Sequence, residues 1–212
     1  MILFGVLTCF LAGCLAQRPH PCSSPPLLSG GLTVDTQNEK LTMYGRYLYD
    51  ALGQRIRVME LGSFENTTFT NDALLLYREG VMYEINDHDR TCVKKPLKVD
   101  FQPIAIPKDA SLLAQVVLGS SSEPGQGLLV NTWVGDLPDK TGKVISTVTE
   151  FGCIPVGNLY HTDKFGWVLM NYFDNVLGIP DPERLNPPVF CGGAEMKVED
   201  ETDFLSLFMN KP

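Results

Sequence analysis

Short runs of strand-forming residues, separated by turn residues at roughly ten-residue spacing, constrain the fold of this chain more than any other feature. Residues 55–58 alternate Arg, Ile, Arg and Val, the period-two pattern of a half-buried strand. Gly80 can take the positive φ that a tight turn between two strands needs. Only one helix is expected, over residues 194–208. The chain is therefore predicted to be mostly β, a single antiparallel domain with strands at 42–49, 55–61, 73–77, 81–85, 128–134, 143–151, 154–160 and 165–173.

Two of the expected strands are apolar on both faces. In residues 165–173, Trp167 and Leu169 fall on one face while Met170 falls on the other, and residues 128–134 repeat the feature. An antiparallel sheet normally leaves one face in water, so these strands need a cover: a second sheet, a helix, a partner subunit or a bound apolar ligand. From the residues alone, a closed sandwich core explains the pattern at least as well as a ligand cavity.

The N-terminus has the pattern of an export signal. Residues 2–16 carry no charge and are too short to span a bilayer core of about 30 Å, but they match a signal-peptide core with cleavage after Ala16. Residues 17–212 then form the mature domain, and no later stretch reaches transmembrane length. A lipoprotein signal with lipid on Cys14 is the alternative, although the segment lacks the usual basic residues. We expect a secreted protein.

Removal of residues 1–16 leaves Cys22, Cys92, Cys153 and Cys191. An even number of cysteines in an exported protein indicates two disulfides, with three possible pairings. A zinc site is the less favoured interpretation, because the sequence contains no Cys-x-x-Cys pair. The one N-glycosylation sequon starts at Asn66, which we expect to carry a glycan.

Charge and motifs argue against nucleic acid binding and catalysis. The 17 Lys and Arg against 25 Asp and Glu give a net charge of −8, which disfavours phosphate polyanions. Nucleophile-elbow, zinc-protease, phosphate-loop and dinucleotide fingerprints are all missing from the sequence. Only three histidines are available, so a hydrolase using His88 or His161 is the least favoured function. We expect no enzyme activity.

An acidic turn offers weak calcium candidates. Residues 86–89 read Asn-Asp-His-Asp, and Asp87 and Asp89 bring together the oxygen ligands that calcium prefers. The rest of an EF-hand loop is missing. Because Asn and Asp also crowd turns for backbone reasons, an ordinary turn is the favoured interpretation.

Several blocks of residues carry a family resemblance. They are Tyr49-Asp50-x-x-x-Gln54-Arg55-x-Arg57-Val58, Leu75-Leu76-Tyr77-x-x-Gly80-Val81-Met82-x-x-Ile85, Cys153-x-Pro155-Val156, and Gly178-Ile179-x-Asp181-Pro182 with Pro187-Pro188-x-x-Cys191. In this order, around the same four cysteines, the blocks resemble the ependymin-related proteins over residues 22–191. The tail beyond Cys191 departs most from the family pattern.

The resemblance implies a LolA-like half-barrel of two curved antiparallel sheets around an apolar pocket, with a C-terminal helix. It also implies the disulfides Cys22–Cys153 and Cys92–Cys191. Family members are secreted or lysosomal glycoproteins associated with lipid or ganglioside binding, cell adhesion and calcium. No calcium ligand set transfers to this sequence, so calcium remains only a candidate cofactor.

These arguments lead to a functional hypothesis. We expect a non-enzymatic, secreted or lysosomal glycoprotein, in homodimeric form, that binds a fatty acid, phospholipid or ganglioside. Burying about a dozen methylenes would contribute on the order of 10 kcal/mol before ordering costs. The alternative is a calcium-associated extracellular adhesion or signalling module that acts through a dimer or receptor interface. The residues expected to line the pocket in part are Trp133, Phe165, Trp167, Leu169 and Phe173.

Overall fold

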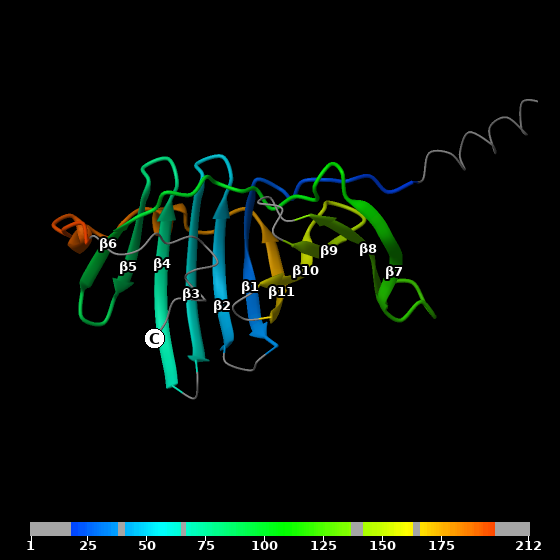
Figure 1. Ribbon diagram of the computed structural model, residues 1–212, viewed down its shortest axis with the longest axis horizontal. Coiled ribbons are helices and arrows are strands. Elements are labelled where there is room, and N and C mark those ends of the chain that lie inside the picture. The colour runs from blue at the N-terminus through cyan, green and yellow to red at the C-terminus, as the bar shows by residue number, and fades with distance from the viewer. Residues whose placement is uncertain (1–17, 38–40, 65–66, 137–141, 163–165, 198–212) are drawn as a thin grey trace, which may run out of the picture.

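The structure is a computed structural model that describes residues 18–37, 41–64, 67–136, 142–162 and 166–197. The described chain forms one open, eleven-stranded antiparallel sheet in the order β6-β5-β4-β3-β2-β1-β11-β10-β9-β8-β7 (Figure 1). The strands are β1 (Leu27–Thr36), β2 (Leu41–Asp50), β3 (Arg55–Phe64), β4 (Thr67–Leu76), β5 (Val81–Asn86), β6 (Thr91–Pro96), β7 (Ser111–Gly119), β8 (Gly127–Asp136), β9 (Lys143–Thr149), β10 (Pro155–Thr162) and β11 (Gly166–Leu177).

The sheet consists of two meanders joined at its centre. Strands β1 to β6 each pair with the next along the chain, and strands β7 to β11 do the same. Because β1 pairs with β11, with Leu32 opposite Tyr172, the two meanders form one continuous sheet. The two curved antiparallel sheets expected from the sequence are therefore the two halves of one open half-barrel.

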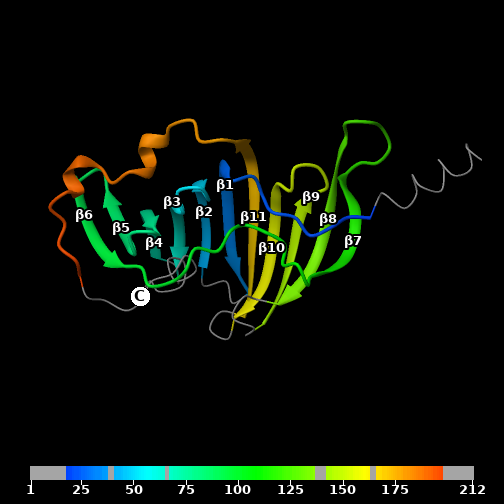
Figure 2. The same cartoon turned by 90° about the horizontal axis from the view of Figure 1, so that it is seen from above.

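The segment of residues 97–110 covers one face of the sheet, here called the pocket face. It leaves β6 at one edge and reaches β7 at the other, and it crosses on the side opposite to residues 178–197 (Figure 2). Leu97 is buried in the main core, and Phe101 and Ile104 pack against that core. This stretch, here called the crossing segment, is thus the cover of the pocket face.

The opposite face, here called the outer face, is covered over strands β3 to β6. Residues 178–197 contain two 3-10 helices, η1 (Pro182–Leu185) and η2 (Val189–Cys191), and Leu185 is fully buried in a second core with Leu74. Arg57 links the layers, because its guanidinium pairs with Asp72 at 2.6 Å and donates to the Arg184 carbonyl at 2.8 Å. Burial works to lower the pKa of Arg57, but bonding to Asp72 raises it overall.

Both disulfides join distant segments. Cys22 is bonded to Cys153, and Cys92 is bonded to Cys191, as the family resemblance implied. The first ties the N-terminal arm to the turn between β9 and β10, and the second ties η2 to β6.

Most predicted strands are confirmed, with extensions. Gly80 has a φ of 63° in the turn between β4 and β5, as predicted. Strands β1, β6 and β7 were not predicted. Of the helix expected over residues 194–208, the structure describes only 194–197, where Met196 forms a β-bridge with Lys94. The remainder of that range, the expected signal peptide and Asn66 lie outside the described residues.

Candidate functional site

A pocket of about 370 Å³ lies between the pocket face and the crossing segment. Its volume falls in the range typical of small-molecule sites, about 300–1,000 Å³. Most of the lining is apolar. The described lining residues are Leu32, Tyr47, Tyr49, Ile56, Tyr77, Val99, Asp100, Gln102, Pro103, Ile104, Ala105, Ile106, Pro107, Asp136, Val144, Ser146, Val148, Pro155, Asn158, Tyr160, Met170 and Tyr172.

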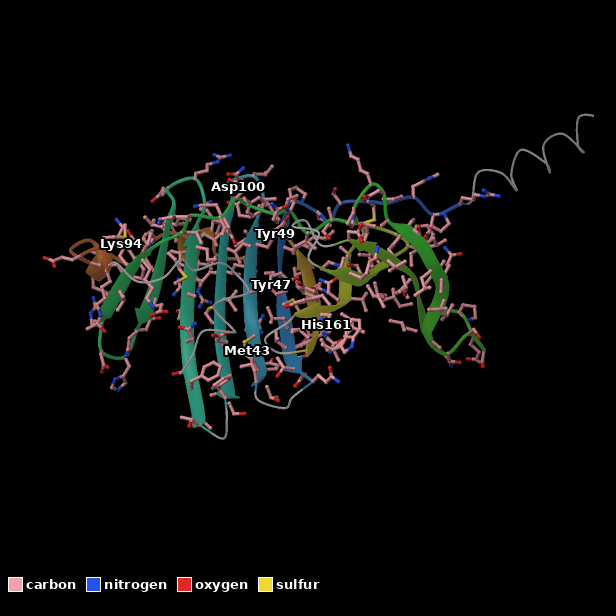
Figure 3. All side chains as sticks on the ribbon, viewed as in Figure 1. Met43, Tyr47, Tyr49, Lys94, Asp100 and His161 are labelled. Carbon is pink, nitrogen blue, oxygen red and sulfur yellow. A yellow bond between two sulfur atoms is a disulfide. The ribbon has the colours of Figure 1, made fainter. Side chains whose placement is uncertain are left out.

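The floor of the pocket is formed by alternate residues of neighbouring strands. Tyr47 and Tyr49 of β2 share the pocket face with Met43, and Figure 3 shows the three following one another along the strand. Met170 and Tyr172 of β11 line the same pocket. Side chains alternate between the faces of a strand, so the intervening residues point to the outer face.

The roof is residues 102–107, held by the N-terminal arm. The Ser24 N–H donates to the Ile104 carbonyl at 2.9 Å, and the Ile106 N–H donates to the Cys22 carbonyl at 2.8 Å. From the floor, the Tyr49 hydroxyl accepts a hydrogen bond from the Ile104 N–H at 3.0 Å. Because Cys22 is disulfide-bonded to Cys153, the arm that holds the roof is itself covalently tied to the turn between β9 and β10.

Three of the five tyrosines in the described lining have hydroxyls that are hydrogen-bonded to the protein and a raised pKa. Tyr47 donates to Asn175 Oδ1, and Tyr172 is hydrogen-bonded to Asn158. Burial raises the pKa of both phenols well above the ordinary tyrosine value of about 10. The pKa of Tyr49 is also raised by burial, against the opposing effect of its bond to Ile104. The interior of the pocket therefore disfavours negative charge.

Three polar residues of the described lining are exposed: Asp100, Gln102 and Asp136. Asp136 forms an ion pair with the exposed Lys143. Among the described lining residues, none is Lys, Arg or His. A bound molecule thus meets mostly apolar surface, together with exposed carboxylate and amide groups.

The residues of β11 that the sequence suggested as pocket lining do not line this pocket. Trp167 and Leu169, 40% and 41% exposed, pair with His161 and Leu159 of β10 on the outer face. Phe173 also lies on that face, where its ring stacks on Tyr44 at a centroid distance of 5.5 Å. The pocket uses the alternate residues of this strand, Met170 and Tyr172. An apolar pattern on both faces does not say which face is enclosed, and the prediction chose the more aromatic one.

The other two predicted residues have different outcomes. Trp133 is 3% exposed and packs with Ile106 and Val148, which line the pocket, so its indole lies behind the pocket wall. Its Nε1 is buried without a hydrogen-bond partner in the described structure. Phe165 lies outside the described residues.

Sequence reasoning missed the tyrosines of the floor. The signal was present in β2, because Met43, Tyr47 and Tyr49 recur at even spacing. The roof had no such signal, since residues 102–107 acquire their role only by crossing the whole sheet.

The acidic turn forms its own hydrogen bonds. Asn86 Nδ2 donates to Asp89 Oδ2, and the Asp89 N–H donates to Asn86 Oδ1. His88 Nδ1 lies 2.7 Å from Asp89 Oδ1, while Asp87 Oδ2 lies 4.0 Å from the Arg57 guanidinium. In the part of the chain that the structure describes, no group of three or more His, Cys, Asp or Glu side chains is arranged to hold a metal. The turn interpretation accounts for these contacts.

His161 stands in an aromatic contact on the outer face. Its ring lies edge-on to Trp167, with centroids 5.4 Å apart.

Among the described helices, none has the length and hydrophobicity needed to cross a bilayer.

The fold defines an open antiparallel β half-barrel whose pocket face is covered by residues 97–110, and solved structures contain a counterpart. A crystal structure of an uncharacterized conserved protein from Thermus thermophilus aligns with a TM-score of 0.52. The alignment covers 82% of this chain and 90% of that chain at 12% sequence identity, so the likeness concerns the fold alone.

Sequence comparison identifies the family. The ependymin family model matches residues 65–191. Ependymin-2 of Carassius auratus is 31% identical over 209 residues, covering 98% of this chain and 97% of its own length. Mammalian ependymin-related protein 1 of Mus musculus is 29% identical over 187 residues, covering 87% of this chain and 82% of its own length. The chain belongs to the ependymin family.

Proposed function

We propose that this protein is a secreted, non-enzymatic carrier that holds the apolar chain of an amphiphilic lipid in the pocket under residues 102–107. The observation that carries the proposal is the pocket itself, a mostly apolar space of about 370 Å³ in which the hydroxyls of Tyr47 and Tyr49 are hydrogen-bonded to the protein. Fatty acids, phospholipids and gangliosides all have chains suited to such a space.

The volume and the energetics support this proposal. The pocket volume of about 370 Å³ lies within the range of sites that enclose small apolar ligands. Burying about a dozen methylenes contributes on the order of 10 kcal/mol before the costs of ordering and association. Micromolar binding requires about 8 kcal/mol net.

The two disulfides support the proposed compartment. Disulfides persist in oxidising environments, which include the extracellular space and the lumen of the secretory pathway. The expected signal peptide and the sequon at Asn66 agree with that route. We propose extracellular residence, with the lysosomal lumen as the second compartment.

A pair of adjacent substitutions tests the carrier function. Val144 lines the pocket, whereas Ile145, the next residue of β9, faces the other way. The native protein, purified from a secreting host, is extracted with organic solvent, and the extract is analysed by mass spectrometry. We expect bound lipid in the wild type and in Ile145→Phe, and much less in Val144→Phe. Absence of lipid from the wild type, together with failure of the delipidated protein to bind added lipid, would refute the proposal.

The outer face favours a second candidate function, an adhesion or signalling module that acts through a homodimer or receptor. Tyr44, Leu61, Trp167 and Leu169 are between 40% and 58% exposed there. An apolar surface of this kind is common at protein interfaces. Sedimentation of the wild type and of Leu169→Asp over a range of concentrations tests it. If the second candidate function holds, the wild type associates with itself or with a receptor. Leu169→Asp removes that association and leaves the lipid content unchanged.

A further inference from the structure

Strand β11 contains a β-bulge where it pairs with β1. Two of its residues, Asp174 and Asn175, lie opposite the single residue Gly30. Asp174 has a φ of 50°, the left-handed conformation that the first residue of one class of bulge adopts. Tyr172 lines the pocket, so strict alternation would turn Asn175 to the outer face. A bulge shifts this alternation, and bulges beside functional sites re-aim side chains in this way.

The amide of Asn175 spans the junction of the two meanders on the pocket face. Its Oδ1 accepts a hydrogen bond from the Tyr47 hydroxyl of β2, and its Nδ2 donates to the Pro155 carbonyl of β10 at 3.0 Å. Strands β2, β1, β11 and β10 lie side by side in this order (Figure 1), so one side chain joins strands on both sides of the β1–β11 pair. Both partners line the pocket, whereas Asn175 is not among the described lining residues.

Gly30 provides the space for this amide. Tyr47 lies opposite Gly30 in the pairing of β2 with β1, so the bond between Tyr47 and Asn175 passes over the glycine. A Cβ atom at residue 30 would lie 2.7 Å from Asn175 Oδ1, too close for the amide to stay in place. The Tyr47 ring also meets the Tyr172 ring edge-on, with centroids 5.7 Å apart. Asn175 and Tyr172 thus fix the Tyr47 side chain from two directions.

Loss of the amide would change the floor of the pocket. Tyr47 is 3% exposed, and a buried hydroxyl without a partner is unfavourable. Its hydroxyl would turn toward another partner or bond to water that enters beside it, and the Pro155 carbonyl would lose its side-chain donor. Either response alters the shape and the polarity of the space that an apolar chain fills.

On the basis of the proposed carrier function, we infer that Asn175 is a positioning residue of the pocket. Its amide holds Tyr47 of one meander and Pro155 of the other at the separation that closes the floor around an apolar chain. The bulge in β11 aims the amide, Gly30 gives it room, and the ligand need not touch it.

Binding of dodecanol, which is uncharged at either pH used, tests the inference. It is titrated by calorimetry into the delipidated full-length protein at about pH 7 and at about pH 4.5. Asn175→Ala should bind dodecanol at least about tenfold more weakly than the wild type at both pH values, a difference of about 1.4 kcal/mol. Asn171→Ala is the matched control, because Asn171 of the same strand bonds to Thr33 Oγ1 at 3.3 Å instead. Its affinity should stay within about twofold of the wild type.

Asn175→Asp separates positioning from general destabilisation. At about pH 7 the introduced carboxylate can accept the bond from Tyr47 but cannot donate to the Pro155 carbonyl, so the affinity should fall as in Asn175→Ala. Protonation supplies the missing donor, and burial raises the pKa of a carboxyl group. At about pH 4.5 the affinity should therefore return to within about threefold of the wild type at that pH, whereas Asn175→Ala should show no recovery.

The outcomes separate the inference from the function beneath it. Wild-type affinity in Asn175→Ala, or an equal loss in Asn171→Ala, overturns the role of Asn175 and leaves the carrier function standing. If Asn175→Ala does not fold, Asn175→Asp decides, and equally weak binding at both pH values overturns the role. Failure of the wild type to bind dodecanol counts against the carrier function, and the inference falls with it.

Discussion

Tyr49 and Ile104 face each other across the pocket, and the Tyr49 hydroxyl accepts a hydrogen bond of 3.0 Å from the Ile104 backbone N–H. This bond joins the floor of the sheet to the middle of the roof. Tyr49 is 1% exposed and also stacks on Phe101 of the crossing segment. One side chain of β2 therefore packs against the roof segment and satisfies one of its backbone donors.

Replacing Tyr49 by Phe should loosen the roof. The ring and its stacking are kept, but the Ile104 N–H loses its partner, which we expect to cost about 1–3 kcal/mol of unfolding free energy. Lipid dissociation, followed by stopped-flow fluorescence, should become faster. Tyr44→Phe removes a hydroxyl from the exposed outer face and should change neither quantity. Equal behaviour of the two variants would mean that the bond does not hold the roof.

The two disulfides should have similar effects on stability and different effects on binding. They span 131 and 99 residues, for which the chain-entropy model gives about 5 kcal/mol each. Cys22→Ser with Cys153→Ser releases the arm that bonds the roof, so ligand affinity should fall in the variant that remains folded. Cys92→Ser with Cys191→Ser releases η2 on the outer face and should spare affinity. Denaturant unfolding and lipid titration are the measurements, and equal losses of affinity would contradict this assignment.

Alkaline pH should destabilise the protein through the buried tyrosines. Unfolded tyrosine ionises near pH 10, whereas burial raises the pKa of Tyr47 and Tyr172 in the folded state. The native state then keeps protons that the unfolded state has lost, so stability is fully present below about pH 10 and falls as the pH rises through the folded pKa values. Each phenol contributes a slope of up to about 1.4 kcal/mol per pH unit.

Urea midpoints measured between about pH 8 and about pH 11 check this dependence. Tyr47→Phe combined with Tyr172→Phe should flatten the decline. Tyr44→Phe is the control on the outer face. A decline of the same slope in the double variant would show that other groups cause it.

The Arg57–Asp72 ion pair should contribute more to the free energy of unfolding than the exposed pair of Lys143 and Asp136. The Arg57 side chain is 5% exposed and that of Asp72 17%, so Asp72→Asn leaves a nearly buried guanidinium with only the exposed, more distant carboxylate of Asp87 at 4.0 Å. We expect a loss of about 3 kcal/mol of unfolding free energy. Lys143→Met breaks a surface pair and should cost less than about 1 kcal/mol. Chemical denaturation measures both, and similar costs would indicate that Arg57 finds other partners when Asp72 is neutral.

Particular residues show how far sequence reasoning reached. The alternation of Arg55, Ile56, Arg57 and Val58 identified β3, and Gly80 identified a turn, because both signals depend on local backbone geometry. Strand β7 was missed because its exposed position at the sheet edge leaves it with little alternation to detect. The pairing of β1 with β11 could not be predicted from local sequence patterns either, since it joins residues far apart along the chain.

The sequence by itself determined that the chain is mostly β, that its family pattern pairs Cys22 with Cys153 and Cys92 with Cys191, and that some strands are apolar on both faces. These properties follow from local periodicity and from motifs that keep their order along the chain. Only the tertiary structure decided which side of β11 encloses the pocket. Alternation defines two faces without ranking them, and the choice depends on where the distant segment 97–110 crosses the sheet.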